Sequence, residues 1–321
     1  MKKLVLLILL CTGLSAQAQK QKVIFDCDLG GDIDDAFALA LLLTSQEEFE
    51  ILGLCMDHGD TEGRGRIASK ILYQADLEDI PVYLGKHTPN VVGKDTALAG
   101  PSQQYMWAED FRTIKPKPQP AHEFIIETLN KFPDEVILFT VGPVDNIEDV
   151  LDVDPKALKK AKKVVSMFGS VKYGYGLSEE ISDEWNVRAN IRASQKLMNS
   201  GADLLLAPLD VTAHVILNDK YLNAIAMRDT PMTDALGALY ALWYKHADWA
   251  NHPVMFDGVA IGMVLWPELF ETTSAHIYVD ENGFTRIDGS KKPNCEYGSS
   301  INKDEFLLRM SRRILEQDFK R

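Results

Sequence analysis

The chain has 321 residues, 46% of them hydrophobic, and a formal net charge of −13 at pH 7. This length and hydrophobic content are sufficient for a large buried core. The acidic balance excludes nucleic acid and anionic membrane surfaces as the main partners, because both are bound by basic faces.

The amino terminus has the composition of a secretory signal peptide. Lys2-Lys3 gives it a basic start, residues 4–10 form an apolar run too short to span a bilayer, and a small-x-small cleavage site ends at Ala18. We therefore interpret residues 1–18 as a signal peptide and expect a periplasmic or secreted protein. Lipid attachment at Cys11 is the less favoured alternative, because the residues before it lack the small side chains of a lipid-attachment site.

The rest of the chain, residues 19–321, is expected to form a single domain. No Ser/Gly/Pro-rich linker divides it, and the Pro-rich segment 115–120 is long enough only for a loop. The three cysteines after the signal peptide, Cys27, Cys55 and Cys295, are odd in number and widely spaced, which argues against a disulfide framework. We interpret them as packing residues. No stretch of this region is long and apolar enough for a membrane span.

The first predicted strand, residues 23–28, leads into an acidic loop and then into a buried helix over residues 34–44, with Gly30 and Gly31 making the turn. Five carboxylates lie within ten consecutive residues, namely Asp26, Asp28, Asp32, Asp34 and Asp35. Like charges at this density are unfavourable without a compensating cation, and carboxylate oxygens suit Ca²⁺ or Mg²⁺. Helix capping would explain the last two aspartates but not the pair at the strand end.

Strand-like and helix-like segments alternate after this loop. Strands are predicted at residues 50–56, 81–84, 136–141, 164–168 and 204–207. The helices between them are predicted at residues 63–75, 122–131, 190–200 and 211–217. Helices at 232–245 and 303–319, and between them a hairpin of 275–279 with 283–287, follow. This order predicts an α/β fold, a mainly parallel twisted sheet flanked by helices, with ligand bound beyond the carboxyl ends of the strands.

The acidic loop resembles the amino-terminal signature of the nucleoside hydrolases, the inosine- and uridine-preferring N-ribohydrolases. That signature is Asp-x-Asp-x-Gly followed closely by Asp-Asp, which corresponds here to Asp26, Asp28, Gly30, Asp34 and Asp35. The resemblance implies a Rossmann-related open α/β fold. It also implies Ca²⁺-dependent hydrolysis of the N-glycosidic bond of a ribonucleoside or related N-riboside, giving free base and ribose, in salvage of external nucleosides.

Further segments extend the resemblance over nearly the whole mature chain and imply a metal site. The strand that ends at Val141 is similar to a family strand whose last residue lends a backbone carbonyl to Ca²⁺. The segment 256–258, Phe-Asp-Gly, stands where the family has His-Asp-Pro and the last carboxylate ligand. The implied Ca²⁺ ligands are Asp28, Asp35, Asp257 and the Val141 carbonyl. Asp28 is also the implied general base, which activates a water held by the ion.

The same resemblance implies a ribose pocket. Glu184-Trp185-Asn186 is similar to a Glu-Phe-Asn motif whose carboxylate and amide bind sugar hydroxyls. Met167 is implied to line the pocket, although a methionine at a strand end is more often a core residue. Asp34 is implied to bind the sugar near the metal. Asp60 replaces a family asparagine that reaches the sugar, which turns an amide donor into a further acceptor.

The leaving-group end departs from the family pattern at Phe256. Purine-type members often have a histidine at this position as the leaving-group acid, whereas phenylalanine can stack on a base but cannot donate a proton. The candidates for a replacement acid or a stacking wall are His214, His246, His252, Tyr244, Trp243 and Trp249. The expected partner is therefore a small-molecule N-riboside of unspecified base. A homo-oligomer is compatible with the family.

Two alternatives remain. The first is a non-catalytic sugar- or nucleoside-binding protein with the same fold, which Phe256 and Asp60 would favour. The second is a Mg²⁺-dependent phosphatase of the haloacid-dehalogenase type with Asp26 as nucleophile. It is the weaker alternative, because Gly31 stands where such loops have Thr or Val and because Asp257 is left unexplained.

Overall fold

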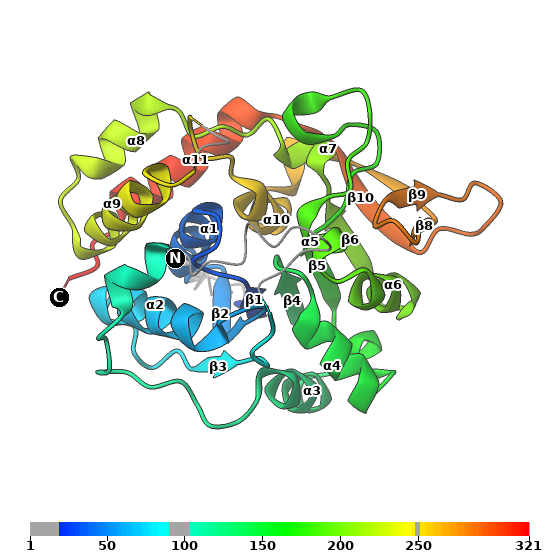
Figure 1. Cartoon of the computed structure of the whole chain (residues 1–321), viewed down its shortest axis with the longest axis horizontal. Helices are drawn as coiled ribbons and strands as arrows, with labels where there is room; N and C mark the ends of the chain where they lie inside the picture. The colour runs from blue at the N-terminus through cyan, green and yellow to red at the C-terminus, as the bar shows by residue number, and fades with distance from the viewer. Residues whose placement is uncertain (1–18, 90–102, 248–250, 321) are drawn as a thin grey trace, which may run out of the picture.

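Figure 1 shows the computed structural model of the chain, which describes residues 19–89, 103–247 and 251–320. The predicted signal peptide, Cys11 and Trp249 lie outside the described residues. The core of the molecule is an eight-stranded sheet in the order β3-β2-β1-β4-β5-β6-β10-β7, in which only β7 runs antiparallel to its neighbour. The predicted α/β fold with a mainly parallel sheet is confirmed.

The strand bounds follow the buried apolar runs of the sequence. They are β1 Gln21–Cys27, β2 Phe49–Met56, β3 Val82–Leu84, β4 Val136–Thr140, β5 Lys163–Met167, β6 Leu204–Ala207, β7 Phe270–Ala275 and β10 Cys295–Ile301. A separate two-stranded hairpin joins β8 Ile277–Val279 to β9 Thr285–Ile287, as predicted.

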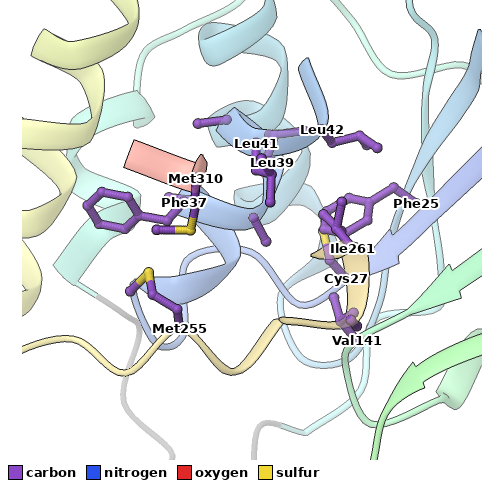
Figure 2. Close-up of a cluster of buried hydrophobic side chains, with 14 of the residues drawn as sticks. Phe25, Cys27, Phe37, Leu39, Leu41, Leu42, Val141, Met255, Ile261 and Met310 are labelled. Atoms are coloured by element: carbon purple, nitrogen blue, oxygen red, sulfur yellow. The ribbon is translucent and has the colours of Figure 1, made fainter. Parts of the chain in front are cut away.

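Helices pack on both faces of the sheet and enclose two hydrophobic cores. On β1, Val23, Phe25 and Cys27 face the first core and Ile24 faces the second, as the two-residue period of a strand requires. The first core is covered by α1 Asp34–Leu43, α2 Thr61–Gln74, α7 Leu209–Thr212, α9 Pro231–Tyr244, α10 Phe256–Leu265 and α11 Lys303–Glu316. The second is covered by α3 Ala121–Lys131, α4 Asp145–Val153 and α6 Ile191–Asn199. Figure 2 shows Phe25 and Cys27 of β1 within the first core.

The strand order creates a switch point at β1. The chain moves outward from β1 through β2 to β3 on one side, and from β4 through β5 to β6 on the other. Connections on the two sides leave in opposite directions, so a crevice opens beyond the carboxyl ends of β1 and β4. The acidic loop follows β1, and Val141 follows β4. The fold therefore brings these two segments to the same edge.

One predicted helix is wrong. The segment predicted as helical over residues 211–217 contains only the end of α7, which stops at Thr212. Beyond it, Ile216 forms an antiparallel bridge with Val254, and Leu217 N donates to Pro253 O. Pairing with a distant segment thus outweighs the local helical pattern.

Several elements were not predicted from the sequence. They are α4, α5 Trp185–Ala189, α8 Asp219–Ala226, α10, β7 and β10. The last predicted helix also ends earlier than expected, at Glu316. The three cysteines are buried and free, as expected of packing residues. Among the described residues, no helix has both the length and the apolar character that crossing a bilayer requires.

Candidate active site

The loop after β1 is held in one conformation by its neighbours. Gly30 has a φ of +95°, and a Cβ at this position would lie 2.7 Å from Ile67 Cδ1, so only glycine fits without strain. Gln104 Nε2 donates to the carbonyls of Gly31 and Asp32, at 3.1 and 3.0 Å. The loop therefore presents Asp28 at the carboxyl edge of the sheet as a fixed group.

Three carboxylates converge at this edge. Asp34 and Asp35 occupy the first turn of α1, Asp257 occupies the first turn of α10, and one oxygen of each lies within 4.8 Å of the others. All three side chains are buried. Asp257 N donates to Asp34 Oδ2 at 3.1 Å, which joins the two helices. Burial, reinforced by the neighbouring carboxylates, raises the pKa of all three groups well above the usual aspartate value.

The predicted metal ligands are only partly gathered in this group. Asp35 and Asp257 belong to it, and Asp34, which was assigned to the sugar, belongs to it as well. Asp28 does not; its Oδ2 lies 3.7 Å from Arg64 Nη2, and a Cβ at Gly142 would lie 3.1 Å from its Oδ1. Asp28 therefore lies beside Arg64 and beside Gly142, two residues after the end of β4.

The predicted ribose-binding residues form a second buried group beside β4 and β5. The Glu184 carboxylate caps α5 and accepts hydrogen bonds from the backbone amides of Gly169, Asn186 and Val187. Burial raises its pKa to about 7. Asn186 Nδ2 donates to the Val141 carbonyl at 2.9 Å and to the Met167 carbonyl at 3.2 Å. These bonds fix the predicted carbonyl ligand and the predicted sugar-binding amide relative to each other.

The structure shows contacts of Asp60 and Phe256 that the sequence did not specify. Asp60 is the N-cap of α2, and its Oδ1 accepts from Gly63 N at 3.0 Å, so that one carboxylate oxygen is committed to the helix. Phe256 is the first residue of α10 and is half-buried. Its ring meets that of Tyr175 edge to face, with the centroids 6.1 Å apart. Tyr175 is 43% exposed and was not predicted as a site residue.

The candidate leaving-group residues have diverse surroundings. His252 Nε2 lies 3.1 Å from Oδ1 of the exposed Asp219, and His246 is exposed. Burial lowers the pKa of His214. Trp243 is buried in α9 and hydrogen-bonds to the Asp32 side chain, whereas Tyr244 is exposed. None of these observations singles out one of them as an acid.

A buried polar network behind β1 was missed in the sequence. Asn146 Nδ2 donates to Asp26 Oδ1 at 2.7 Å, and Asp57 accepts from the backbone amides of Asp145 and Asn146. His58 Nδ1 lies 2.9 Å from Asp145 Oδ2. Asp26 is fully buried, and this burial raises its pKa to about 7. Such a carboxylate cannot serve as the exposed nucleophile of a phosphatase, so Asp26 is a structural residue that anchors α4.

Replacing Asn146 by alanine is expected to lower the free energy of unfolding by about 1–3 kcal/mol, the usual effect of leaving a buried acceptor unpaired. Asp26 Oδ1 loses its donor, whereas the Met56 carbonyl keeps a hydrogen bond from Gly85 N. Urea denaturation measures the change. Asn130→Ala, at an exposed position, is the matched control and should shift stability by less than about 0.5 kcal/mol. An equally small effect of Asn146→Ala would contradict the anchoring role.

Comparisons with known proteins point to one family, the nucleoside hydrolases. A profile of the family described as inosine-uridine preferring nucleoside hydrolase matches residues 23–308. The pyrimidine-specific ribonucleoside hydrolase RihB of Escherichia coli O157:H7 is 26% identical over 313 residues, which cover 90% of this chain and 95% of RihB.

Two solved structures share the fold. A plant nucleoside hydrolase, PpNRh1, has a TM-score of 0.80 at 21% identity, covering 93% of this chain and 100% of the other. A purine-preferring ribonucleoside hydrolase from Gardnerella vaginalis has a TM-score of 0.77 at 21% identity, covering 92% of this chain and 98% of the other.

Proposed function

Because the chain belongs to the inosine-uridine preferring nucleoside hydrolase family, we propose that it is a Ca²⁺-dependent N-ribohydrolase that releases free base and ribose from a nucleoside or related N-riboside. The observation that carries this proposal is the convergence of Asp34, Asp35 and Asp257 beside Asp28 at the carboxyl edge of the sheet. Buried carboxylates are stable as anions only when a cation compensates them.

The chemistry of the donor set fits a hard divalent cation. Asp35 Oδ1 is buried without a hydrogen-bond partner among the described residues. Together with the other carboxylates and the Val141 carbonyl, it offers the all-oxygen coordination that Ca²⁺ prefers. When bound, Ca²⁺ supplies a positive charge that polarises a water and orients ribose hydroxyls.

Asp28 is the residue best suited to act as general base. Its side chain is 14% exposed, so that water can reach it, whereas the three converging carboxylates are nearly inaccessible. In the proposed reaction, Asp28 accepts a proton from the water as the water oxygen bonds to the anomeric carbon. The carbon–nitrogen bond breaks, the leaving base takes its electron pair, and a base that leaves as an anion takes up a proton from solvent.

The remaining residues hold the ribose. The Glu184 carboxylate keeps one orientation, because three backbone amides donate hydrogen bonds to it. Asn186 lies next to it and Asp34 lies across the metal site. Met167, whose sulfur is 3.3 Å from Asn186 Nδ2, provides an apolar wall. This division into polar arms and an apolar wall suits a sugar with defined hydroxyl positions.

The test is release of reducing sugar from purine and pyrimidine nucleosides and from nicotinamide riboside, each with Ca²⁺ and with a chelator. We expect release that requires Ca²⁺ and whose rate ranks the leaving groups. The relatives named above differ in base preference, so the ranking carries new information. Tight binding of a nucleoside by folded, Ca²⁺-loaded protein without any turnover would instead establish the non-catalytic alternative.

We further propose that the protein acts outside the cytoplasm, after cleavage of the signal peptide. The basic start, short apolar run and small residues before Gln19 support this proposal. Amino-terminal sequencing of the protein recovered from the producing cell should give Gln19 as the first residue. An intact Met1 would contradict it.

A further inference from the structure

Arg64 is a buried guanidinium that reaches under the acidic loop from α2. It is 1% exposed and is the only lysine or arginine buried within residues 19–89, 103–247 and 251–320. Nε donates to the His58 carbonyl at 2.7 Å, and Nη1 donates to the Leu29 carbonyl at 3.1 Å. Nη2 lies 3.7 Å from Asp28 Oδ2. The fork therefore connects the end of β2, the loop after β1 and the candidate base.

The position of this charge is significant because a buried cation is costly unless anions compensate it. Asp28 is the contacting anion. Asp28 is also one of the residues to which we assign the metal, so the charge of Arg64 lies beside that site. Arg64 thus contacts the one residue to which we assign both a metal contact and the proton transfer.

The two oxygens of Asp28 have different surroundings. Oδ2 faces Arg64, whereas Oδ1 lies on the side of Gly142, the residue that follows Val141. Nη2 faces Oδ2 as an ion pair at 3.7 Å, and this charge favours the orientation in which Oδ2 lies on the side of Arg64 and Oδ1 on the side of Gly142. The loop that carries Asp28 is fixed by the same guanidinium through Leu29.

We propose that Arg64 is a positioning residue for the hydrolytic reaction: it holds the Asp28 carboxylate in one orientation, and its charge weakens the affinity of the adjacent site for Ca²⁺. This inference rests on the proposed function. It assigns opposite effects to one side chain, since Arg64 assists turnover and opposes metal binding. A side chain that only maintained the fold would affect both in the same direction.

The experiment combines Ca²⁺ titration of the metal-free protein, by calorimetry, with steady-state kinetics on the best nucleoside. For R64M we expect Ca²⁺ to bind about tenfold more tightly, because a like charge is removed from a low-dielectric site. We expect kcat to fall about 10²-fold with KM little changed, the effect of a misplaced reacting group. Weaker or unchanged Ca²⁺ binding, or an unchanged kcat, would overturn the proposal.

Two further variants separate the charge of Arg64, the planar shape of its guanidinium and its contribution to folding. R64K keeps the charge but not the planar fork, so it should bind Ca²⁺ like the wild type while kcat stays low. If R64M does not fold, R64K becomes the test of the proposal. Tighter Ca²⁺ binding or a normal kcat in R64K would then refute the positioning role of Arg64. R66M is the matched control on the same helix, because Arg66 Nε has no hydrogen-bond partner within the described part of the chain. It should leave both quantities unchanged.

The failure of this inference and that of the proposed function are distinguishable. A wild-type protein that binds Ca²⁺ but hydrolyses no N-riboside refutes the proposed function and the assistance to turnover. An active wild type with unaltered Ca²⁺ affinity in R64M refutes the assignment to Arg64 alone.

Discussion

Asp28→Asn is expected to lower kcat by about 10²–10⁴-fold, the range for loss of a positioned general base. Asparagine has nearly the same shape as aspartate but cannot accept a proton from water. The loop should keep its conformation, because Gln104 and Arg64 hold it through backbone carbonyls and not through the Asp28 side chain alone. The measurement is kcat at saturating nucleoside and saturating Ca²⁺, with circular dichroism to establish that the variant is folded.

Asp203→Asn is the matched control for this change. Asp203 immediately precedes β6 and therefore lies at the amino end of the strands, at the edge of the sheet opposite to the site. It should leave kcat unaltered. A folded Asp28→Asn enzyme that kept more than about a tenth of wild-type kcat would show that another group removes the proton.

Removal of Ca²⁺ is expected to abolish turnover and to destabilise the protein in a pH-dependent way. At a free Ca²⁺ concentration about 100 times its Kd, the bound ion should add about 2.7 kcal/mol to the free energy of unfolding. The difference in Tm between Ca²⁺-loaded and chelated protein should widen from about pH 5 to about pH 8. Differential scanning calorimetry in buffers that do not bind calcium measures this difference.

The direction follows from the raised pKa values of the buried carboxyls. In the unfolded chain, the side-chain pKa values of aspartate and glutamate are about 4. In the folded, metal-free protein, burial and the neighbouring carboxylates raise the pKa of Asp34, Asp35 and Asp257 well above normal. The folded state therefore binds more protons than the unfolded state, and stability falls as pH rises through this window. Ca²⁺ binds the ionised form and offsets the loss.

A gap in Tm that stayed constant or narrowed with rising pH would contradict this account. The Asp35→Asn variant provides a control, because it replaces one ionisable ligand by a neutral group of the same shape. Its metal-free form should be more stable than the metal-free wild type near pH 8, whereas its response to Ca²⁺ should be weaker.

The spacing of residues along the sequence was enough to predict the acidic loop and the two aspartates, Asp34 and Asp35, that begin α1. The strand before it is continuously apolar, and the aspartates lie within ten residues of each other, so that one strand-to-helix connection defines their positions. The parallel sheet followed from the alternation of strands and helices in the first two thirds of the chain. The helices and strands late in the chain, such as α10 and β7, were harder to predict.

Helix α10 shows why. Its sequence, FDGVAIGMVL, is apolar on every side because the helix is buried all round, so it has no amphipathic period to detect. Its Asp257-Gly258 pair is more typical of a turn. The edge strand β7 is mostly exposed and rich in Thr and Ser, so its pairing with β10 depends on neighbours far away in sequence.

The polar partners of the site were beyond sequence reasoning for the same reason. Arg64 contacts Leu29, 35 positions earlier, and Asn146 contacts Asp26, 120 positions earlier. Nothing in either local sequence distinguishes these side chains from ordinary helix residues.

The bond between Asp257 and Asp34 joins residues 223 positions apart in the chain. During synthesis, the chain that has emerged up to β6 already contains Asp28, Asp34 and Asp35, but their last partner is still missing. The proposed Ca²⁺ site is therefore completed by one of the latest segments to be made, because Asp257 lies on α10. A chain that ends before α10 lacks Asp257 and should not bind calcium at the proposed site, so calcium binding reports completion of the chain.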